Sequence, residues 1–484
     1  MEAAYTAAQV RRLEEAAMLH VAADTLMQRA AHGLAVACVD ELRSRRGGVY
    51  GAQVVVLVGP GNNGGDALFA GARLAQRGAS VLAVAALGRP HASGLAALLA
   101  AGGRLVQLAE LEGQVPDQLN LVLDGVLGIG GRPGLPTPLA GLATELAERR
   151  VPTIAVDLPS GVETDTGAAS TETFLATRTV TFGILKPCHL LEPARSRCGR
   201  VDLVAIGLDV SLEVPSMLAW ESDDLALRWP YPDEGSDKYS RGVVAIDTGS
   251  QTYPGAAILN TYGAVHAGAG MVRFLGPPAA AEVISAQLPN VVLAPGRVQA
   301  HLLGSGWGDR PDGTDAIADA VASDLPVLVD ADGLRHLPKE LPPTCLLTPH
   351  AGELARLLDC SRAQVQADPV GAVRAGADLT GATVLLKGAT QLVARPGSGQ
   401  VGIAVRGPAW TAQAGSGDTL AGICVTLLAA GVPAFDAALL GASLQAVTAA
   451  GFPGPLPPHA LAQRCAEMLG QLQQRRSELQ AQGL

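Results

Sequence analysis

The stretch from Ala414 to Thr419 (A-G-S-G-D-T) places two glycines and an aspartate directly before a long helical pattern rich in alanine and leucine. Glycines let backbone N–H groups crowd toward an anion, and the start of a helix adds free donors and a positive dipole end. Asp418 could accept the proton of a hydroxyl that attacks a phosphate held there. The pattern indicates a phosphoryl-transfer site, but an ordinary strand-to-helix turn with Asp418 as its N-cap explains the hexapeptide equally well.

Polar side chains in the first half of the chain follow three apolar runs. Asn62, Asn63 and Asp66 follow one run, Asp124 ends another, and residues 157–161 (D-L-P-S-G) follow a third. Ligands of open parallel sheets bind at the carboxyl ends of the strands, so these side chains are expected to lie close together. Their oxygens could hold a hard cation or the riboses and phosphates of a nucleotide. Each motif alone could be a capped turn, whereas three together favour a site.

Two series of apolar strands alternating with helices are predicted to position these residues, which is typical of doubly wound α/β sheets. In the first series, strands are expected from 53 and at 80–86, 119–124, 152–157, 179–183 and 201–206, and helices at 8–20, 22–43, 66–78, 92–101 and 138–150. In the second series, strands are expected at 242–246, 271–275, 326–332, 383–395 and 401–406, and helices after Gly255, at 314–323, between 350 and 380, and after Gly417. The predicted domains are residues 1–215 and 236–484, with a turn-rich linker at 216–235.

Composition excludes several classes of protein. A chain of 484 residues is too long for one core, and 48% hydrophobic with 17% charged residues predicts a folded chain. A net charge of −10 without a basic run argues against a nucleic-acid scaffold. The most apolar run, Leu420–Val432, is too short to span a membrane, and the acidic start lacks the apolar core of a signal peptide.

The cysteines and the alanine-rich helices suggest where and how the protein works. Seven scattered cysteines without a C-x-x-C pair predict reduced thiols in the cytoplasm, with neither a zinc site nor a disulfide framework. The alanine-rich helices expected at 8–43 and 434–450 favour a homo-oligomer.

Four motifs of the first half occur in an order that resembles the NAD(P)H-hydrate epimerase family. They are N-N-G-G-D at 62–66, D-x-x-x-G-x-G at 124–130, D-x-P-S-G at 157–161 and F-G-x-x-K-P at 182–187. The resemblance covers about residues 3–210 and implies a Rossmann-like domain that interconverts the R and S forms of hydrated NADH or NADPH.

The same resemblance implies roles for individual residues. Asp157 would be catalytic, and Asn63, Asp124 and Ser160 would be ligands of a potassium ion. Arg132 stands where the family often has a lysine, and Ala67 where it usually has a third glycine. The implied substrate contacts are Asn62, Asn63, Gly64, Gly65, Asp66, Gly128, Ile129, Gly130, Gly131, Arg132, Pro133, Gly134 and Asp157.

Motifs of the second half resemble the ribokinase-like superfamily, and within it the nucleotide-dependent NAD(P)H-hydrate dehydratases. They include D-A-D-G-L at 330–334, T-P-H-x-G-E at 348–353, K-G-A at 387–389 and G-x-G-D at 415–418, over a match of about residues 236–470. The T-P-H-x-G-E sequence discriminates, because sugar kinases of the superfamily commonly carry N-x-x-E. The implied contacts to the hydrated cofactor are Ala256, Gly306, His350 and Asp418, and those to the nucleotide are Lys387, Gly388, Ala389, Thr390, Gln391 and Gly417.

Together the two halves resemble the bifunctional NAD(P)H-hydrate repair family, whose substrate carries a hydroxyl on the ring carbon beside the nitrogen. Hydroxide leaves poorly at neutral pH, so phosphoryl transfer to that oxygen, with ADP as the expected donor, makes its loss easier. Asp418 would be the base, and the N–H groups of residues 414–417 the anion hole. Glu353 is a candidate Mg²⁺ ligand or a solvated helix residue, and His350 is a substrate contact or a structural histidine.

Two other functions stay open at the level of sequence. The A-G-S-G-D-T form of the turn leans toward the sugar-kinase branch, so a kinase for a vitamin precursor or a small sugar is one alternative. A nucleotide-sensing or partner-binding module in the N-terminal half is the other. Loss of Asp124 and Asp157 would favour that module, and both residues are present.

Overall fold

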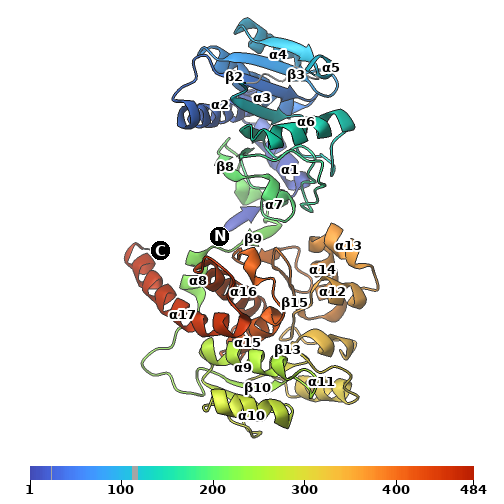
Figure 1. Cartoon of the computed structure of the whole chain (residues 1–484), viewed down its shortest axis with the longest axis vertical. Coiled ribbons are helices and arrows are strands. Elements are labelled where there is room, and N and C mark those ends of the chain that lie inside the picture. Colours follow the sequence, from blue (N-terminus) through green and yellow to red (C-terminus); the bar gives the residue numbers. More distant parts are fainter. Residues whose placement is uncertain (23, 112–117, 484) are drawn as a thin grey trace. The chain divides into compact units, whose positions relative to one another are not determined.

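The chain folds into two compact units in this computed structural model, which describes residues 1–22, 24–111 and 118–483 (Figure 1). The N-terminal unit comprises Ala3–Ser216. The C-terminal unit comprises Met217–Leu484 together with Met1–Glu2. Each unit is built on its own mostly parallel sheet, so the prediction of an α/β fold is confirmed.

The sheet of the N-terminal unit has the strand order β4-β3-β2-β5-β6-β7-β8, and all its neighbouring pairs are parallel. Strand order reverses between β2 and β5, which is the switch point where ligands of doubly wound sheets bind. Edge strand β4 was not predicted, because its four residues are short and only partly buried. The strands are β2 (Gln53–Val58), β3 (Ser80–Ala85), β4 (Arg104–Gln107), β5 (Leu121–Gly125), β6 (Thr153–Val156), β7 (Arg178–Phe182) and β8 (Arg200–Val204).

Helices cover both faces of this sheet because alternate residues of β2 point to opposite sides. Val54 and Val56 pack with α2, α3 and α4, whereas Val55 and Leu57 pack with α6. The short strand β1 (Glu2–Ala4) precedes α1, where Thr6 and Gln9 form a capping box. The helices are α1 (Ala7–Met18), α2 (Thr25–Arg46), α3 (Asn62–Ala75), α4 (Ala92–Ala100), α5 (Leu108–Leu111), α6 (Thr137–Glu148) and α7 (Ala194–Arg197), with 3₁₀ turns η1 (Pro187–His189) and η2 (Val210–Leu212).

The sheet of the C-terminal unit runs β1-β9-β17-β16-β15-β14-β13-β12-β10-β11. From β9 to β11, its pairs are parallel except around β16, which lies antiparallel to both β15 and β17. The strands are β9 (Met217–Ala219), β10 (Val243–Asp247), β11 (Met271–Phe274), β12 (Ala300–Leu303), β13 (Val327–Val329), β14 (Leu346–Leu347), β15 (Thr383–Leu386), β16 (Leu392–Ala394) and β17 (Val401–Ile403).

Helix α15 forms the centre of the C-terminal unit and is buried along almost its whole length after the first turn. It crosses α9 where two glycines leave no room for a side chain. A Cβ on Gly422 would lie 2.1 Å from Asn260 O, and one on Gly263 would lie 2.3 Å from Thr419 O. The helices are α8 (Ser222–Arg228), α9 (Pro254–His266), α10 (Pro278–Gln287), α11 (Gly313–Ala322), α12 (Ala351–Leu357), α13 (Arg362–Ala367), α14 (Pro369–Thr380), α15 (Ser416–Ala429), α16 (Ala434–Ala450) and α17 (Pro458–Ala481), with 3₁₀ turns η3 (Ala331–Arg335) and η4 (Ala409–Thr411). None of the described helices combines the length and apolarity needed to cross a membrane.

The segment 216–235 is not the linker that the sequence predicted. It contains β9 and α8, and Trp220, Leu225 and Trp229 are buried in the core of the C-terminal unit. The Trp-Pro-Tyr-Pro turn after α8 suggested a boundary, but the apolar residues before that turn already belong to the second core.

Candidate active sites

The turn that begins α15 has the backbone expected of an anion-binding loop. Gly415 precedes the helix with a φ of 89°, in the left-handed region that disfavours any residue with a Cβ. No side chain among the described residues caps this helix end, and Asp418 lies within its first turn. The interpretation of Asp418 as the N-cap is therefore wrong.

The donors of this turn differ slightly from those predicted. Ser416 N–H donates to Gln413 O at 3.2 Å, and Thr419 N–H makes the first helical hydrogen bond, to Gly415 O at 3.1 Å. Between them, the N–H groups of Gly417 and Asp418 have no acceptor among the described hydrogen bonds. The N–H groups of Ala414 and Gly415 likewise have no acceptor among the described hydrogen bonds, so Ser416 N–H is the one predicted donor of 414–417 that is already bonded there.

Asp418 has the electrostatic surroundings of a general base. Burial and, after it, the nearby charge of Asp330 raise the pKa of its carboxyl to about 7, although the Lys387 ammonium offsets part of this effect. The charge of Glu353 also raises the pKa. A carboxyl that titrates near neutrality takes up and releases protons efficiently at physiological pH.

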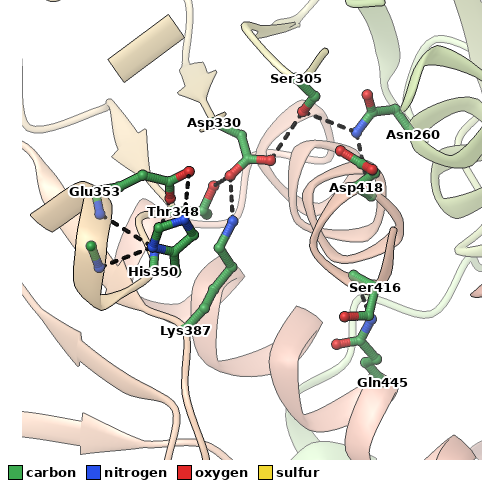
Figure 2. Close-up of polar contacts among 11 residues, drawn as sticks. Asn260, Ser305, Asp330, Thr348, His350, Glu353, Lys387, Ser416, Asp418 and Gln445 are labelled. Carbon is green, nitrogen blue, oxygen red and sulfur yellow. Dashed lines mark hydrogen bonds and ion pairs between the residues drawn. The ribbon is translucent and has the colours of Figure 1, made fainter. Parts of the chain in front are cut away.

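A buried aspartate, Asp330, connects the parts of this site (Figure 2). It follows β13, is 1% exposed, and accepts hydrogen bonds from the Ser305 hydroxyl (3.0 Å), the Thr348 hydroxyl (2.8 Å) and Lys387 Nζ (2.6 Å). Burial disfavours the Lys387 ammonium, but the charges of Asp330, Glu353 and Asp418 together with the Asp330 hydrogen bond outweigh this effect and raise the lysine pKa. A Cβ on Gly417 would lie 3.1 Å from Lys387 Nζ, so the ammonium sits beside the first turn of α15.

His350 and Glu353 form a capping box at the start of α12 (Figure 2). His350 Nδ1 accepts from the N–H groups of Gly352 (3.0 Å) and Glu353 (3.2 Å), and Glu353 Oε2 accepts from His350 N–H (2.7 Å). Glu353 is 7% exposed, so its interpretation as a solvated helix residue is wrong. The His350 side chain is 57% exposed, which leaves its ring accessible to a ligand.

The predicted cofactor contacts of this unit lie around the same site. A Cβ on Gly306 would lie 2.6 Å from Ala256 Cβ, so these two residues are in contact next to Ser305. Lys387 N–H donates to Pro349 O at 2.8 Å, which joins the K-G-A segment to the T-P-H segment. Gly388, Ala389, Thr390 and Gln391 form the turn between β15 and β16, and Lys387 is the residue of this segment that reaches Asp330.

The three predicted potassium ligands of the N-terminal unit meet at the carboxyl end of β5. Asp124 is fully buried and accepts from Ser160 Oγ (2.6 Å) and Ser160 N–H (2.7 Å). Leu127 N–H donates to Ser160 Oγ (2.8 Å), and Asn63 Nδ2 donates to Leu127 O (2.9 Å). Burial raises the pKa of Asp124 to about 6, and the hydrogen bonds from Ser160 oppose this shift.

This oxygen cluster fits a monovalent cation better than a transition metal. The described residues contain no group of three or more His, Cys, Asp or Glu side chains arranged to hold a metal. Asn63, Asp124, Ser160 and the Leu127 carbonyl instead provide amide, carboxylate, hydroxyl and backbone oxygens, which are hard ligands with a single negative charge.

Asp157 lies beside a buried lysine. Lys186 is 1% exposed, and its Nζ donates to Asp157 Oδ1 (2.5 Å), Thr181 Oγ1 (2.9 Å) and Phe182 O (3.2 Å). Burial favours protonation of Asp157, but the Lys186 charge and hydrogen bond outweigh it and lower the pKa of Asp157. Asp157 is therefore ionised at neutral pH.

His189 hydrogen-bonds to the backbone carbonyl of Asp157, and it was not identified from the sequence. Its Nδ1 accepts from Lys186 N–H (3.0 Å), so Nε2 carries the hydrogen and donates to Asp157 O (2.9 Å). Burial and the Lys186 charge lower its pKa to about 4, so the ring is neutral. A lone histidine after a lysine-proline pair gives no sequence signal for this role.

Two further carboxyls face Asp157. Asp66 is buried, and its Oδ1 has no hydrogen-bond partner among the described residues. Burial, followed by the charges of Asp157 and Glu14, raises its pKa well above the usual value. Burial likewise raises the pKa of Glu14 on α1, which the sequence did not single out. The unit thus combines one carboxylate of lowered pKa with two carboxyls of raised pKa.

The loop after β5 carries the remaining predicted contacts. A Cβ on Gly128 would lie 3.2 Å from Asn63 Cγ, so this end of the loop adjoins the oxygen cluster. Gly134 N–H donates to Gly161 O at 2.9 Å, which ties the other end to the D-L-P-S-G segment. Arg132 and Pro133 are exposed between these ends. The loop therefore borders the site, with its charged residue outside the buried cluster.

A Rossmann-like unit with a buried carboxylate cluster, followed by a unit that places a carboxyl of raised pKa at a helix N-terminus, is typical of a class of two-domain nucleotide-binding enzymes. Two family models match the chain: residues 23–188 match the YjeF-related protein N-terminus, and residues 244–464 match NAD(P)H-hydrate dehydratase.

The chain belongs to the family of bifunctional NAD(P)H-hydrate repair enzymes. It is 44% identical over 447 residues to the enzyme of that name from Mycobacterium tuberculosis, which covers 90% of each chain. It is 43% identical over 467 residues to the one from Mycobacterium leprae, which covers 93% of this chain and 95% of the relative. Among solved structures, it is similar to an ADP/ATP-dependent NAD(P)H-hydrate dehydratase from Bacillus subtilis, with 23% identity, a TM-score of 0.48, and coverage of 52% of this chain and 98% of that one. The predicted family is confirmed, and the two other functions considered from the sequence are not those of this family.

Proposed function

We propose that this chain restores hydrated NADH and NADPH in two reactions, one in each unit. The N-terminal unit interconverts the R and S hydrates, and the C-terminal unit dehydrates the S form at the expense of ADP. The observation that carries the second reaction is a buried base, Asp418, whose pKa is about 7, in the first turn of a helix beside the Lys387 ammonium.

In the dehydration, Asp418 would take the proton from the hydroxyl on the ring carbon beside nitrogen. The oxygen then attacks the terminal phosphorus of ADP, and the bond from that phosphorus to AMP breaks. Lys387 and the N–H groups of Gly417 and Asp418 bind the charge on the transferred phosphoryl group. The ring-nitrogen lone pair expels phosphate with the C–O electron pair, and loss of a proton from the adjacent carbon yields the dihydronicotinamide ring.

The remaining predicted contacts fit this reaction. His350, Ala256 and Gly306 would hold the hydrated ring, and Lys387 to Gln391 would hold the nucleotide. Gln391 Oε1 is buried without a partner among the described residues and is suited to accept a hydrogen bond from a ligand. Glu353 would hold Mg²⁺, which neutralises phosphate charge when bound, and one carboxylate suits an ion that keeps several waters.

In the epimerisation, the ionised Asp157 would act on the same ring carbon, with Asp66 as proton donor. Protonation of the hydroxyl by Asp66 lets the ring nitrogen expel water and leaves a planar cation. Water adds to either face while Asp157 accepts its proton, which produces both epimers. Return of that proton from Asp157 to Asp66 restores both groups. Asn63, Asp124 and Ser160 would hold potassium, which supplies positive charge beside the substrate, and residues 62–66 and 128–134 would contact the substrate.

The direct test uses the purified full-length chain and a mixture of R and S NADH hydrates. With Mg²⁺ and ADP we expect the dihydronicotinamide absorbance at about 340 nm to return for both epimers. ATP in place of ADP tests the donor. Phosphorylation of a free sugar or vitamin alcohol without action on either hydrate would overturn the proposal.

We further propose that the protein works in the cytoplasm as a homo-oligomer. The seven cysteines are free thiols in the described structure, which suits a reducing compartment. Light scattering of the purified chain at several concentrations tests the oligomer, and a constant monomer mass would exclude it.

A further inference from the structure

Asp330 is a buried carboxylate that has no role in the proposed reaction. Its two oxygens take separate partners: Oδ1 accepts from Thr348 and Lys387, and Oδ2 accepts from Ser305. These partners come from different elements, the loop after β12, the loop after β14 and the start of the turn after β15. One carboxylate therefore ties together three of the loops at the carboxyl edge of the sheet.

A chain of hydrogen bonds leads from Asp330 to the turn that carries the base (Figure 2). Ser305 Oγ donates to Asp330 Oδ2, Asn260 Nδ2 lies 3.4 Å from Ser305 Oγ, and the same Nδ2 donates to the backbone carbonyl of Asp418 at 2.8 Å. Asn260 and Ser305 are fully buried, so water does not compete for these contacts. Asp330 thus reaches both the lysine and the base.

We propose that Asp330 is a positioning residue of the dehydratase site, which holds Lys387 against the first turn of α15 and fixes Asp418 through Ser305 and Asn260. This inference rests on the proposed dehydration. It assigns to Asp330 no contact with the substrate, only the placement and charge of the two groups that act on it.

The charge of Asp330 also tunes the base. The titratable groups that act on the Asp418 carboxyl are Asp330, Lys387 and Glu353, from the ends of β13 and β15 and from α12. Cys424, on α15 itself, stays a neutral thiol because burial raises its pKa. Removing the charge of Asp330 lowers the pKa of Asp418, because a like charge is lost and the Lys387 ammonium remains.

The test compares Asp330→Asn with Asp319→Asn, a matched change at an exposed position on α11 of the same unit. The expected result for Asp330→Asn is a fall in kcat for dehydration of roughly 10–100-fold, because a small misplacement of catalytic groups is costly. The KM for ADP should rise, and the acid limb of the kcat–pH profile should move to lower pH by about one pH unit. Asp319→Asn should match the wild type.

Ser305→Ala provides the second variant, because it cuts the chain to Asn260 without changing any charge. Its kcat should fall by about tenfold. Its acid limb should stay near that of the wild type, because no charge beside Asp418 is removed. A fall in kcat without a shift of the acid limb separates the loss of this contact from the loss of the Asp330 charge.

The possible outcomes test the proposed function and the positioning role of Asp330 separately. A wild-type chain that does not dehydrate either hydrate contradicts the proposed function. An active wild type with an unmoved acid limb and unchanged KM in Asp330→Asn overturns the positioning role. If Asp330→Asn does not fold, a wild-type kcat in a folded Ser305→Ala overturns it instead.

Discussion

Each unit of this protein contains a lysine–aspartate ion pair, and the two pairs stand in different relations to the carboxyl that we propose to be catalytic. In the N-terminal unit, Lys186 lowers the pKa of Asp157, which keeps the proposed catalytic carboxylate ionised. In the C-terminal unit, Lys387 pairs with Asp330, and the proposed base is a third residue, Asp418, whose pKa is raised to about 7. The same kind of ion pair thus keeps one carboxylate charged in the first unit, whereas in the second unit burial and the Asp330 charge raise the pKa of a neighbouring carboxyl against the effect of the lysine.

The largest effect on rate is expected from substitution of Asp418. Asp418→Asn should lower the dehydration rate roughly a thousandfold, because it removes the general base and leaves the fold intact. Interconversion of the R and S hydrates, followed by chromatography, should continue at the wild-type rate. A folded variant that loses both activities would show that the two units do not act separately.

Asp157→Asn is the corresponding experiment in the N-terminal unit, where epimerisation should be lost and dehydration retained. Epimerisation should fall by roughly 10²–10⁴-fold because the ionised carboxylate is lost, whereas pure S hydrate should still be dehydrated normally. Glu145→Gln, at the surface of α6, serves as the control. Full epimerase rate in Asp157→Asn would remove this residue from the mechanism.

Lys186→Met tests how strongly the first pair depends on its lysine. Breaking a fully buried pair leaves an unpaired charge, and we expect a loss of about 3–5 kcal/mol of unfolding free energy, measured by chemical denaturation. Lys238→Met is the matched control, since Lys238 is exposed and should change the free energy by less than about 0.5 kcal/mol. Equal stability of the two variants would contradict the ion-pair geometry.

The two reactions should also differ in pH dependence. Dehydration should decline below about pH 7, because protonated Asp418 cannot accept a proton. Epimerisation should persist to much lower pH, since Asp157 remains ionised below its usual range. Initial rates measured separately with each substrate check this, and coincident acid limbs would refute the distinction between the pairs.

The smallest expected effect concerns potassium. The raised pKa of Asp124, about 6 against an ordinary 3.8, means that the folded state binds this proton more tightly. The stability that this proton contributes is complete below pH 3.8 and is lost as pH rises through 6. A bound cation would replace it above that pH, so KCl should stabilise the protein over LiCl by about 1 kcal/mol at alkaline pH. Thermal melts should show the difference vanish near pH 5 and in Asp124→Asn, and equal melts in both salts would argue against the cation.

Local sequence patterns were sufficient to predict the sheets and most of the strand ends. The apolar run of β2 indicates a strand that is buried on both faces, and the glycines before α15 indicate a turn. Those elements and the residues next to them in sequence were therefore predictable. The predicted domain boundary was wrong because the prolines after Trp229 are a stronger local signal than the short strand β9.

The supporting residues could not be found in this way. Asn260 lies in the middle of α9 and meets Asp418 only because α9 and α15 cross closely. His189 and Glu14 acquire their roles from burial beside Lys186 and Asp157, which no local motif encodes. The residues that we propose to act were thus largely visible in the sequence, whereas those that hold them in place depend on tertiary contacts.

The crossing of α9 and α15 has a consequence for protein engineering. With Gly263 and Gly422 at the contact, the backbones of the two helices touch, and no methyl group can be added without pushing the Asn260 carbonyl or the Thr419 carbonyl away. Libraries that seek a new nucleotide preference should keep both positions fixed and vary the turn between β15 and β16. Substitutions at the two glycines would push the two helices apart and displace Asp418.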